Sequence, residues 1–201
     1  MGVSRTRSKT DLSIPKAGLL LCVAIGVLSG CSTGGTVRVA SVQAGTSLEP
    51  QVKLVAFRPL GRGQIDLYMT DLTREQLDPA VALEELSGSL VHVRMFIRPR
   101  AGKTPIDSTA TNATIRHVVL SGGAIGVYGG GGFLFPRSSR TSDPFTGRMR
   151  GATLVLTDRT PNFVDPLGPS TMSLSVRAPR DDALAALIAA RLDESLERFG
   201  P

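Results

Sequence analysis

The chain has 201 residues, with 23 lysines and arginines against 17 aspartates and glutamates, two cysteines and no tryptophan. This length suits one domain with a substantial core, and two cysteines exclude a disulfide-rich fold. The formal net charge is +6, but aromatic side chains that could stack on bases are few, which argues against nucleic-acid binding.

The first 31 residues have the layout of a secretory signal. A basic leader precedes a 12-residue apolar run from Ala17 to Leu28, and small residues follow. The run is too short to cross a bilayer, which takes about 20 apolar residues. We therefore expect residues 1–30 to be a signal peptide that is removed from the mature chain.

The end of this segment, Leu28-Ser29-Gly30-Cys31, resembles the lipobox of bacterial lipoproteins. The resemblance implies that the Cys31 thiol is acylated and becomes the lipid attachment site at the new N-terminus, with the bilayer as a partner. Serine rather than aspartate follows Cys31. By the same resemblance, this favours the outer membrane, facing the periplasm, over the inner membrane.

Two other interpretations of the N-terminus stay open. An ordinary cleaved signal with an unmodified cysteine would leave a secreted domain. The residues Met1–Thr6 also fit the N-myristoylation pattern, but that interpretation leaves the apolar run and Cys31 unexplained.

Removal of the leader changes the charge balance. Residues 1–30 hold four basic residues and one acidic residue, so the mature chain has 19 against 16. This weak excess predicts no nucleic-acid partner. Because Cys22 lies in the leader and Cys31 is the expected lipid attachment site, no thiol remains for a disulfide or a nucleophile. No motif indicates a metal or another cofactor.

Residues 31–50 are rich in glycine, serine and threonine and show no lasting periodicity. This composition predicts a flexible tether after the lipidated cysteine. The single folded domain is then expected to span residues 51–201.

The sequence pattern of residues 51–201 predicts a series of β-strands. In residues 64–72, Ile65, Leu67 and Met69 alternate with polar side chains or tyrosine, as in a half-buried strand. Comparable runs predict strands at residues 52–57, 89–98, 114–120, 124–128, 132–135, 151–157 and 171–177. Residues 73–86 predict a loop with one helical turn, and residues 136–147 predict a second loop.

A helix is predicted at the end of the chain, over residues 181–199. Asp181 or Asp182 can cap its start, and apolar residues recur at steps of three and four, with Leu187 in the middle of the stripe. Such a stripe most often packs on a sheet of its own domain. The elements together predict a mainly β fold, an antiparallel β-sandwich or partly open barrel of about seven to nine strands with one C-terminal α-helix packed on it.

Glycine fills seven of the eleven positions from Gly122 to Gly132. Glycine permits positive φ angles and close backbone approach. We favour two hairpin turns with a bulged strand between them over the alternative, a backbone cradle for an anion or an extended chain.

The middle of the chain is basic, with nine basic residues against two acidic residues between His92 and Arg150. The candidate anion-binding residues are Arg94, Arg98, Arg100 and Lys103. Ordinary solvated loops would produce the same count, and this alternative stays open.

The function expected from these observations is that of a membrane-anchored cell-envelope lipoprotein with a non-catalytic binding or structural role. Its partner would be an anionic envelope component or a protein. The alternative is an envelope hydrolase with a site around His92 or His117. No catalytic residue is assigned, because two histidines among apolar neighbours are more often structural.

Overall fold

The computed structural model describes residue 2 and residues 34–61, 63–100, 110–137 and 143–200. The strands in these ranges are β1 (Gly34–Ser41), β2 (Ser47–Leu48), β3 (Leu54–Gly61), β4 (Gln64–Thr70), β5 (Ser87–Met95), β6 (Ala113–Ser121), β7 (Ala124–Gly132), β8 (Leu134–Pro136), β9 (Phe145–Arg159) and β10 (Ser170–Ala178). The helices there are the 3-10 turns η1 (Glu75–Leu77) and η2 (Leu83–Glu85) and the α-helix α1 (Asp182–Glu197). The mainly β fold with one C-terminal helix is confirmed.

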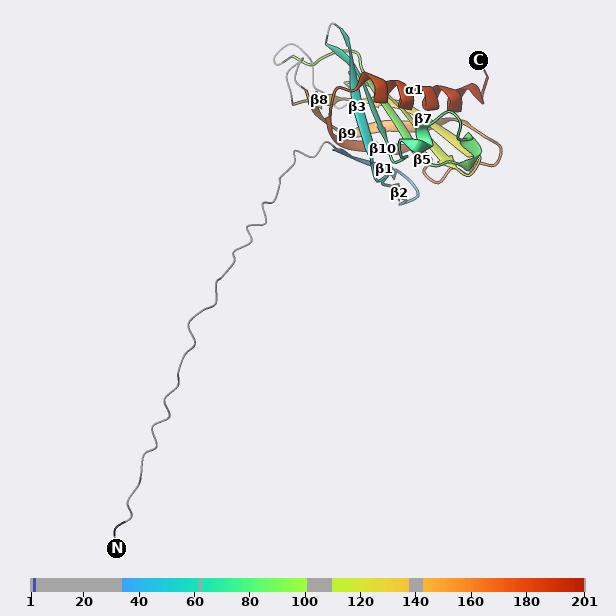
Figure 1. Ribbon diagram of the computed structural model, residues 1–201, viewed down its shortest axis with the longest axis horizontal. Helices are drawn as coiled ribbons and strands as arrows, with labels where there is room; N and C mark the ends of the chain where they lie inside the picture. Colours follow the sequence, from blue (N-terminus) through green and yellow to red (C-terminus); the bar gives the residue numbers. More distant parts are fainter. Residues whose placement is uncertain (1, 3–33, 62, 101–109, 138–142, 201) are drawn as a thin grey trace, which may run out of the picture. The chain divides into compact units, whose positions relative to one another are not determined.

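The described strands form one antiparallel sheet in the order β2-β1-β10-β9-β7-β6-β5-β4-β3, and β8 pairs with β9 outside this path. The sheet curls into a half-barrel (Figure 1). The edge strand β3 approaches the end of β10, where the backbone N–H of Phe57 donates to the carbonyl of Pro179 at 3.0 Å. Among the described residues, no helix is both long and apolar enough to cross a membrane.

The alternation of side chains along the strands divides the core into two clusters. One cluster lines the inside of the curled sheet and includes Leu67 and Met69 of β4. The other joins the outer face of the sheet, including Tyr68 and Val118, to Ile188 of α1. β4 was predicted to be half-buried, but it is buried on both faces from Ile65 to Thr70, because α1 covers its outer side. It therefore contributes to both clusters.

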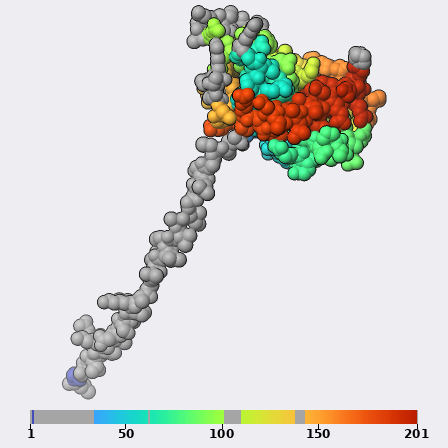
Figure 2. Space-filling view, turned by 45° about the horizontal axis from the view of Figure 1, so that its top comes forward, coloured from blue at the N-terminus to red at the C-terminus, as the bar shows by residue number. Residues whose placement is uncertain are grey.

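α1 lies across the outer face, between β3 and the segment that contains η1 and η2 (Figure 2). The helix begins where the Asp181 carboxylate accepts a hydrogen bond from the Leu184 N–H at 2.8 Å. Ile188 and Leu192 are at most 2% exposed, whereas Leu187 is half-buried. The predicted apolar stripe thus packs on the sheet, but its most buried residue is Ile188 and not Leu187.

Arg191 fixes α1 to the segment before β5. Its side chain is 1% exposed and donates to the carbonyls of Gln76, Asp78 and Val81 at 3.3, 2.5 and 2.6 Å. It also pairs with the Glu194 carboxylate at 2.6 Å. One buried guanidinium therefore satisfies three backbone acceptors that α1 would otherwise cut off from water.

The tether expected for residues 31–50 is wrong from Gly34 onward. β1 pairs with β10 along its whole length, from Gly34 opposite Arg177 to Ser41 opposite Ser170. Val39 of β1 is fully buried in the inner cluster. Val37 and Val39 of β1 alternate with Thr36 and Arg38, as in a strand, but the run is short and lies among glycine, serine and threonine. Its partner strand lies far along the chain. Residues 31–33 lie outside the described part of the chain.

The glycine-rich stretch also differs in part from the favoured prediction. Gly122 and Gly123 form the β6–β7 hairpin turn with φ angles of 55° and 87°, as expected. The expected bulge in the glycine-rich strand is wrong, because the register shift between β7 and β9 leaves the extra residue, Thr157, on β9. Residues 129–132 continue β7 between β6 and β9, so no second turn forms there.

Candidate functional site

Polar side chains gather on the outer face of β3, β4 and β5. Strand pairing places Asp66 directly between Arg58 and Arg94, and it places His92 beside Tyr68. Because alternate residues of a strand share a face, these five side chains point away from the inner cluster. Register alone therefore brings together residues from three strands, which we call the Asp66 cluster.

Asp66 is the centre of this cluster, and its side chain is fully buried. Oδ1 lies 2.9 Å from His92 Nε2 and accepts from Arg94 Nε at 2.8 Å. Oδ2 accepts from Arg94 Nη2 and from Arg58 Nη2, both at 3.2 Å. One carboxylate thus contacts two guanidinium groups and one imidazole.

Several opposing effects set the pKa of Asp66. Burial by itself raises this pKa, but hydrogen bonds from His92 and Arg94, followed by the charge of His92 and a hydrogen bond from Arg58, lower it more. The pKa therefore lies well below its usual range. Asp66 is ionised whenever the protein is near neutral pH.

Tyr68 and His92 stack on each other, with ring centroids 4.7 Å apart and an interplanar angle of 10°. Burial and the nearby Asp66 charge raise the pKa of Tyr68, so its hydroxyl stays protonated. The Tyr68 Oη lies 3.5 Å from Asp66 Oδ2 and accepts from Arg58 Nη2 at 3.4 Å. Stacking and hydrogen bonding hold the His92 ring in one orientation.

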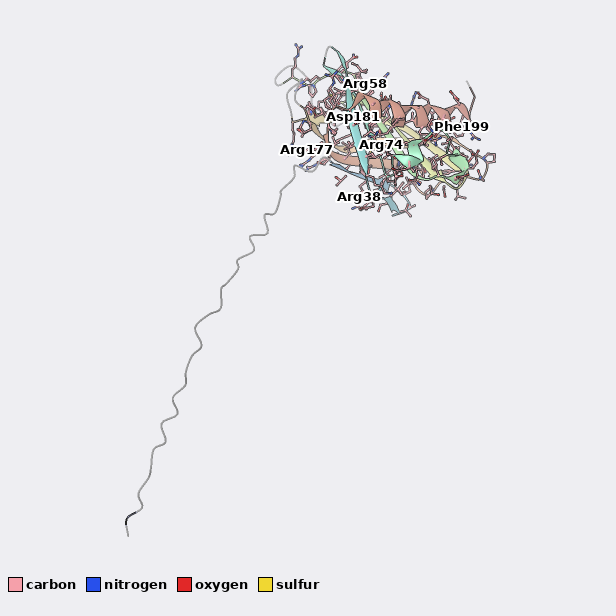
Figure 3. The ribbon with its side chains drawn as sticks, in the orientation of Figure 1. Arg38, Arg58, Arg74, Arg177, Asp181 and Phe199 are labelled. Atoms are coloured by element: carbon pink, nitrogen blue, oxygen red, sulfur yellow. The ribbon has the colours of Figure 1, made fainter. Side chains whose placement is uncertain are left out.

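The Asp66 cluster lies at one end of a groove of about 970 Å³ between α1 and the outer face of the sheet. Small side chains of α1, at Ala186, Ala189 and Ala190, leave this space open. Arg58 lies near the start of α1 and Phe199 just past its end (Figure 3). Since both line the groove, it follows most of the helix, a length of about 20 Å at 1.5 Å per residue.

Charges of both signs line the groove. Arg94 keeps half of its side chain exposed although it is paired with Asp66. Arg116 is exposed and has no ion-pair or hydrogen-bond partner among the described residues. Asp158 and Asp193 also line the groove. The arrangement can hold an elongated ligand with an anionic group at Arg94 and Arg116.

The structure describes three of the four predicted anion-binding residues. Arg94 lines the groove, but its guanidinium is already paired with the Asp66 carboxylate. Arg98 and Arg100 follow β5 and do not line the groove. Lys103 lies outside the described residues, as does Cys31. Of the four candidate residues, the groove therefore includes Arg94 alone among those that the structure describes.

The two histidines lie on opposite faces of the sheet. His92 on the outer face has an acid partner in Asp66, whereas His117 on the inner face is fully buried and lies 3.2 Å from Ser89 Oγ through Nε2. The Nδ1 atom of His117 has no hydrogen-bond partner among the described residues. The described residues thus divide the parts of a Ser-His-Asp site between two faces.

His117 makes stability depend on pH. Burial lowers its pKa to about 4 from an unfolded value of 6.5, so the unfolded state binds a proton before the folded state does. The contribution of neutral His117 to the free energy of unfolding is complete above pH 6.5. It is lost as pH falls toward 4, by about 3 kcal/mol in total.

We expect His117→Leu to reduce the loss of unfolding free energy between pH 6.5 and 4.5, measured by urea denaturation. Asp66 does not interfere, because it titrates below this window. Equal slopes for parent and variant would contradict the prediction.

The sequence did not single out Arg58, Asp66 or Tyr68, and it included Arg116 only among the nine basic residues of the middle of the chain. A weak signal for Asp66 was present, because a carboxylate occupied the non-core face of a strand beside a tyrosine. The pattern did not show that α1 overhangs this face, since that depends on elements far apart in the chain.

Comparison of the chain with family models, with curated proteins and with solved structures finds no match.

Proposed function

We propose that this chain is a lipid-anchored protein of the bacterial cell envelope whose folded domain binds a ligand or partner without catalysing a reaction. The observation that carries the binding role is the groove between α1 and the sheet, with Arg94 and Arg116 among its lining residues. The anchoring rests on the sequence from Ala17 to Cys31, and Ser32 favours the outer membrane, facing the periplasm.

Ligand chemistry follows from the groove. A carboxylate or phosphate group suits Arg116, whose guanidinium has no partner among the described residues, and the exposed half of Arg94. The rest of the ligand would lie along the alanines of α1. An anionic envelope component or an acidic segment of a protein has this chemistry.

An envelope hydrolase is the second candidate, and the contact between His92 and Asp66 at 2.9 Å favours it. A carboxylate that orients a histidine is part of many hydrolytic sites. Against this candidate, the described residues that line the groove include no serine and no cysteine. They also contain no group of three metal-ligating side chains.

We expect Arg116→Gln to weaken binding of small anions in the groove. Inorganic phosphate and succinate, titrated separately while backbone amide resonances are followed, should perturb residues near Arg94 and Arg116. Loss of one charge-assisted hydrogen bond should raise the dissociation constant about tenfold or more. The free energy of unfolding should change by less than about 0.5 kcal/mol, because the side chain is exposed.

Arg159→Gln is the matched control, since Arg159 is also exposed and does not line the groove. Equal affinity of the parent and Arg116→Gln proteins would contradict the binding site. Turnover of p-nitrophenyl esters that survives in Arg116→Gln but not in His92→Gln would instead support the hydrolase.

A further inference from the structure

The outer face of β1, β10 and β9 is a second polar surface, on a part of the sheet that α1 does not cover. Register places Ser175 between Thr36 and Arg148, and Arg38 opposite Ser173. We call this surface the cationic strand face. Its members are Thr36, Arg38, Arg148, Arg150, Ser173, Ser175 and Arg177.

Arginines outnumber acidic side chains on this face. Arg38 pairs with Glu49 at 3.3 Å, and both line a shallow depression of about 360 Å³ together with Arg148 and Arg150. Neither Arg148 nor Arg150 has an ion-pair or hydrogen-bond partner for its guanidinium among the described residues. The only acidic residue within the three strands, Asp158, lies near the end of β9 and lines the groove instead.

The position of β1 in the chain places this face near the anchor. β1 begins at Gly34, three residues after Cys31, and three residues span at most about 11 Å. An acyl chain on Cys31 would hold the start of β1 within about one Debye length of the bilayer surface. This proximity follows from the pairing of β1 with β10, because a free tether to residue 50 would have allowed a much longer reach.

The cationic strand face is oriented so that it can contact a membrane. Arg38 and Arg177 lie on the side of the domain away from α1 (Figure 3). Phe135 of β8 lies opposite Arg148 and is 42% exposed, and an apolar side chain beside basic residues is suited to the boundary between head groups and acyl chains.

We propose that the cationic strand face rests on anionic phospholipid head groups of the membrane that carries the anchor. The proposal rests on the lipid anchoring at Cys31 given above. Arg148 and Arg150 bind phosphate groups through their planar N–H donors, and the serine and threonine hydroxyls complete the contact. The groove under α1 then opens on the side of the domain away from the bilayer.

The experiment uses the full-length lipoprotein, isolated with its native acyl chains and reconstituted into vesicles. A bimane fluorophore is attached to Ser173→Cys, at an exposed position in the centre of the face, and a nitroxide on lipid head groups serves as quencher. Vesicles with phosphatidylglycerol should quench the fluorophore more strongly than vesicles of phosphatidylcholine alone, and 0.5 M salt should remove the difference. A fluorophore at Ala186→Cys on α1 should stay unquenched in both.

Arg148→Gln with Arg150→Gln should shift the equilibrium between apposed and free domain about 30-fold toward the free state, since each arginine near an anionic surface contributes about fivefold. The matched control, Arg159→Gln with Arg198→Gln, removes the same charge from exposed sites elsewhere and should leave the quenching unchanged. Equal loss in both double variants would indicate a general charge effect and overturn the proposal.

Two failures can be told apart. Protein that does not float with either kind of vesicle lacks an acyl anchor, which would overturn the proposed function. Protein that floats with both while the Ser173→Cys fluorophore is unquenched keeps the anchor and overturns only the contact of the cationic strand face.

Discussion

Replacing Cys31 with serine should abolish incorporation of a fatty-acid probe into this protein. Acylation of a lipoprotein forms a thioether on the cysteine sulfur, and the serine hydroxyl does not replace the thiol in that reaction. The unmodified chain should also retain its leader, because processing of the lipoprotein type follows acylation. Metabolic labelling with an alkyne fatty acid, followed by gel fluorescence and intact mass, measures both effects.

Cys22→Ser is the matched control for this experiment. Cys22 lies within the apolar run of the leader, so its replacement should leave the label on the mature chain at the parental level. Equal labelling of the parent and the Cys31→Ser variant would exclude the lipobox interpretation. Label that is lost only in a Gly2→Ala variant would instead support N-myristoylation.

Gly130→Ala should destabilise the domain by about 3 kcal/mol or more. A Cβ atom at this position would lie 1.9 Å from the carbonyl oxygen of Thr153 and 3.0 Å from Leu154 Cδ2. Gly130 pairs with Leu154 between β7 and β9, so the oxygen cannot move away without disturbing the strand pairing. Overpacking against backbone is among the costliest single substitutions, and chemical denaturation of the purified domain would measure it.

Gly34→Ala is the matched control, because Gly34 is also in a strand but has no atom within 4 Å of the added Cβ. Its free energy of unfolding should stay within about 0.5 kcal/mol of the parent. A Gly130→Ala protein of parental stability that has lost anion binding would support the alternative, in which the glycines form a backbone cradle. A large loss of stability would assign the glycine to packing between β7 and β9.

The basic residues in the middle of the chain do not form one surface. Arg94 belongs to the groove, whereas Arg148 and Arg150 belong to the cationic strand face. The basic residues that were counted together between His92 and Arg150 therefore lie on two different surfaces. Charge counts along a chain do not resolve this, because antiparallel strands of a curled sheet distribute consecutive segments over opposite sides of a domain.

The sequence by itself determined the class of fold and the facing of most strands. The alternation of Ile65, Leu67 and Met69 is a local property with a period of two, so it identified the inner face of β4 without knowledge of the partner strands. α1 was equally legible, because its cap at Asp181 and its apolar stripe lie within one continuous segment.

Only the tertiary structure decided which polar residues meet. Asp66 contacts Arg58, His92 and Arg94 because β3, β4 and β5 pair in one register, and a shift by one residue would turn Asp66 into the inner cluster. β1 became a strand through its pairing with β10, more than 100 residues away. Such pairings gain their energy from contacts between distant segments. Local patterns, such as Val37 and Val39 of β1 or the carboxylate at Asp66, therefore did not identify the partner residues.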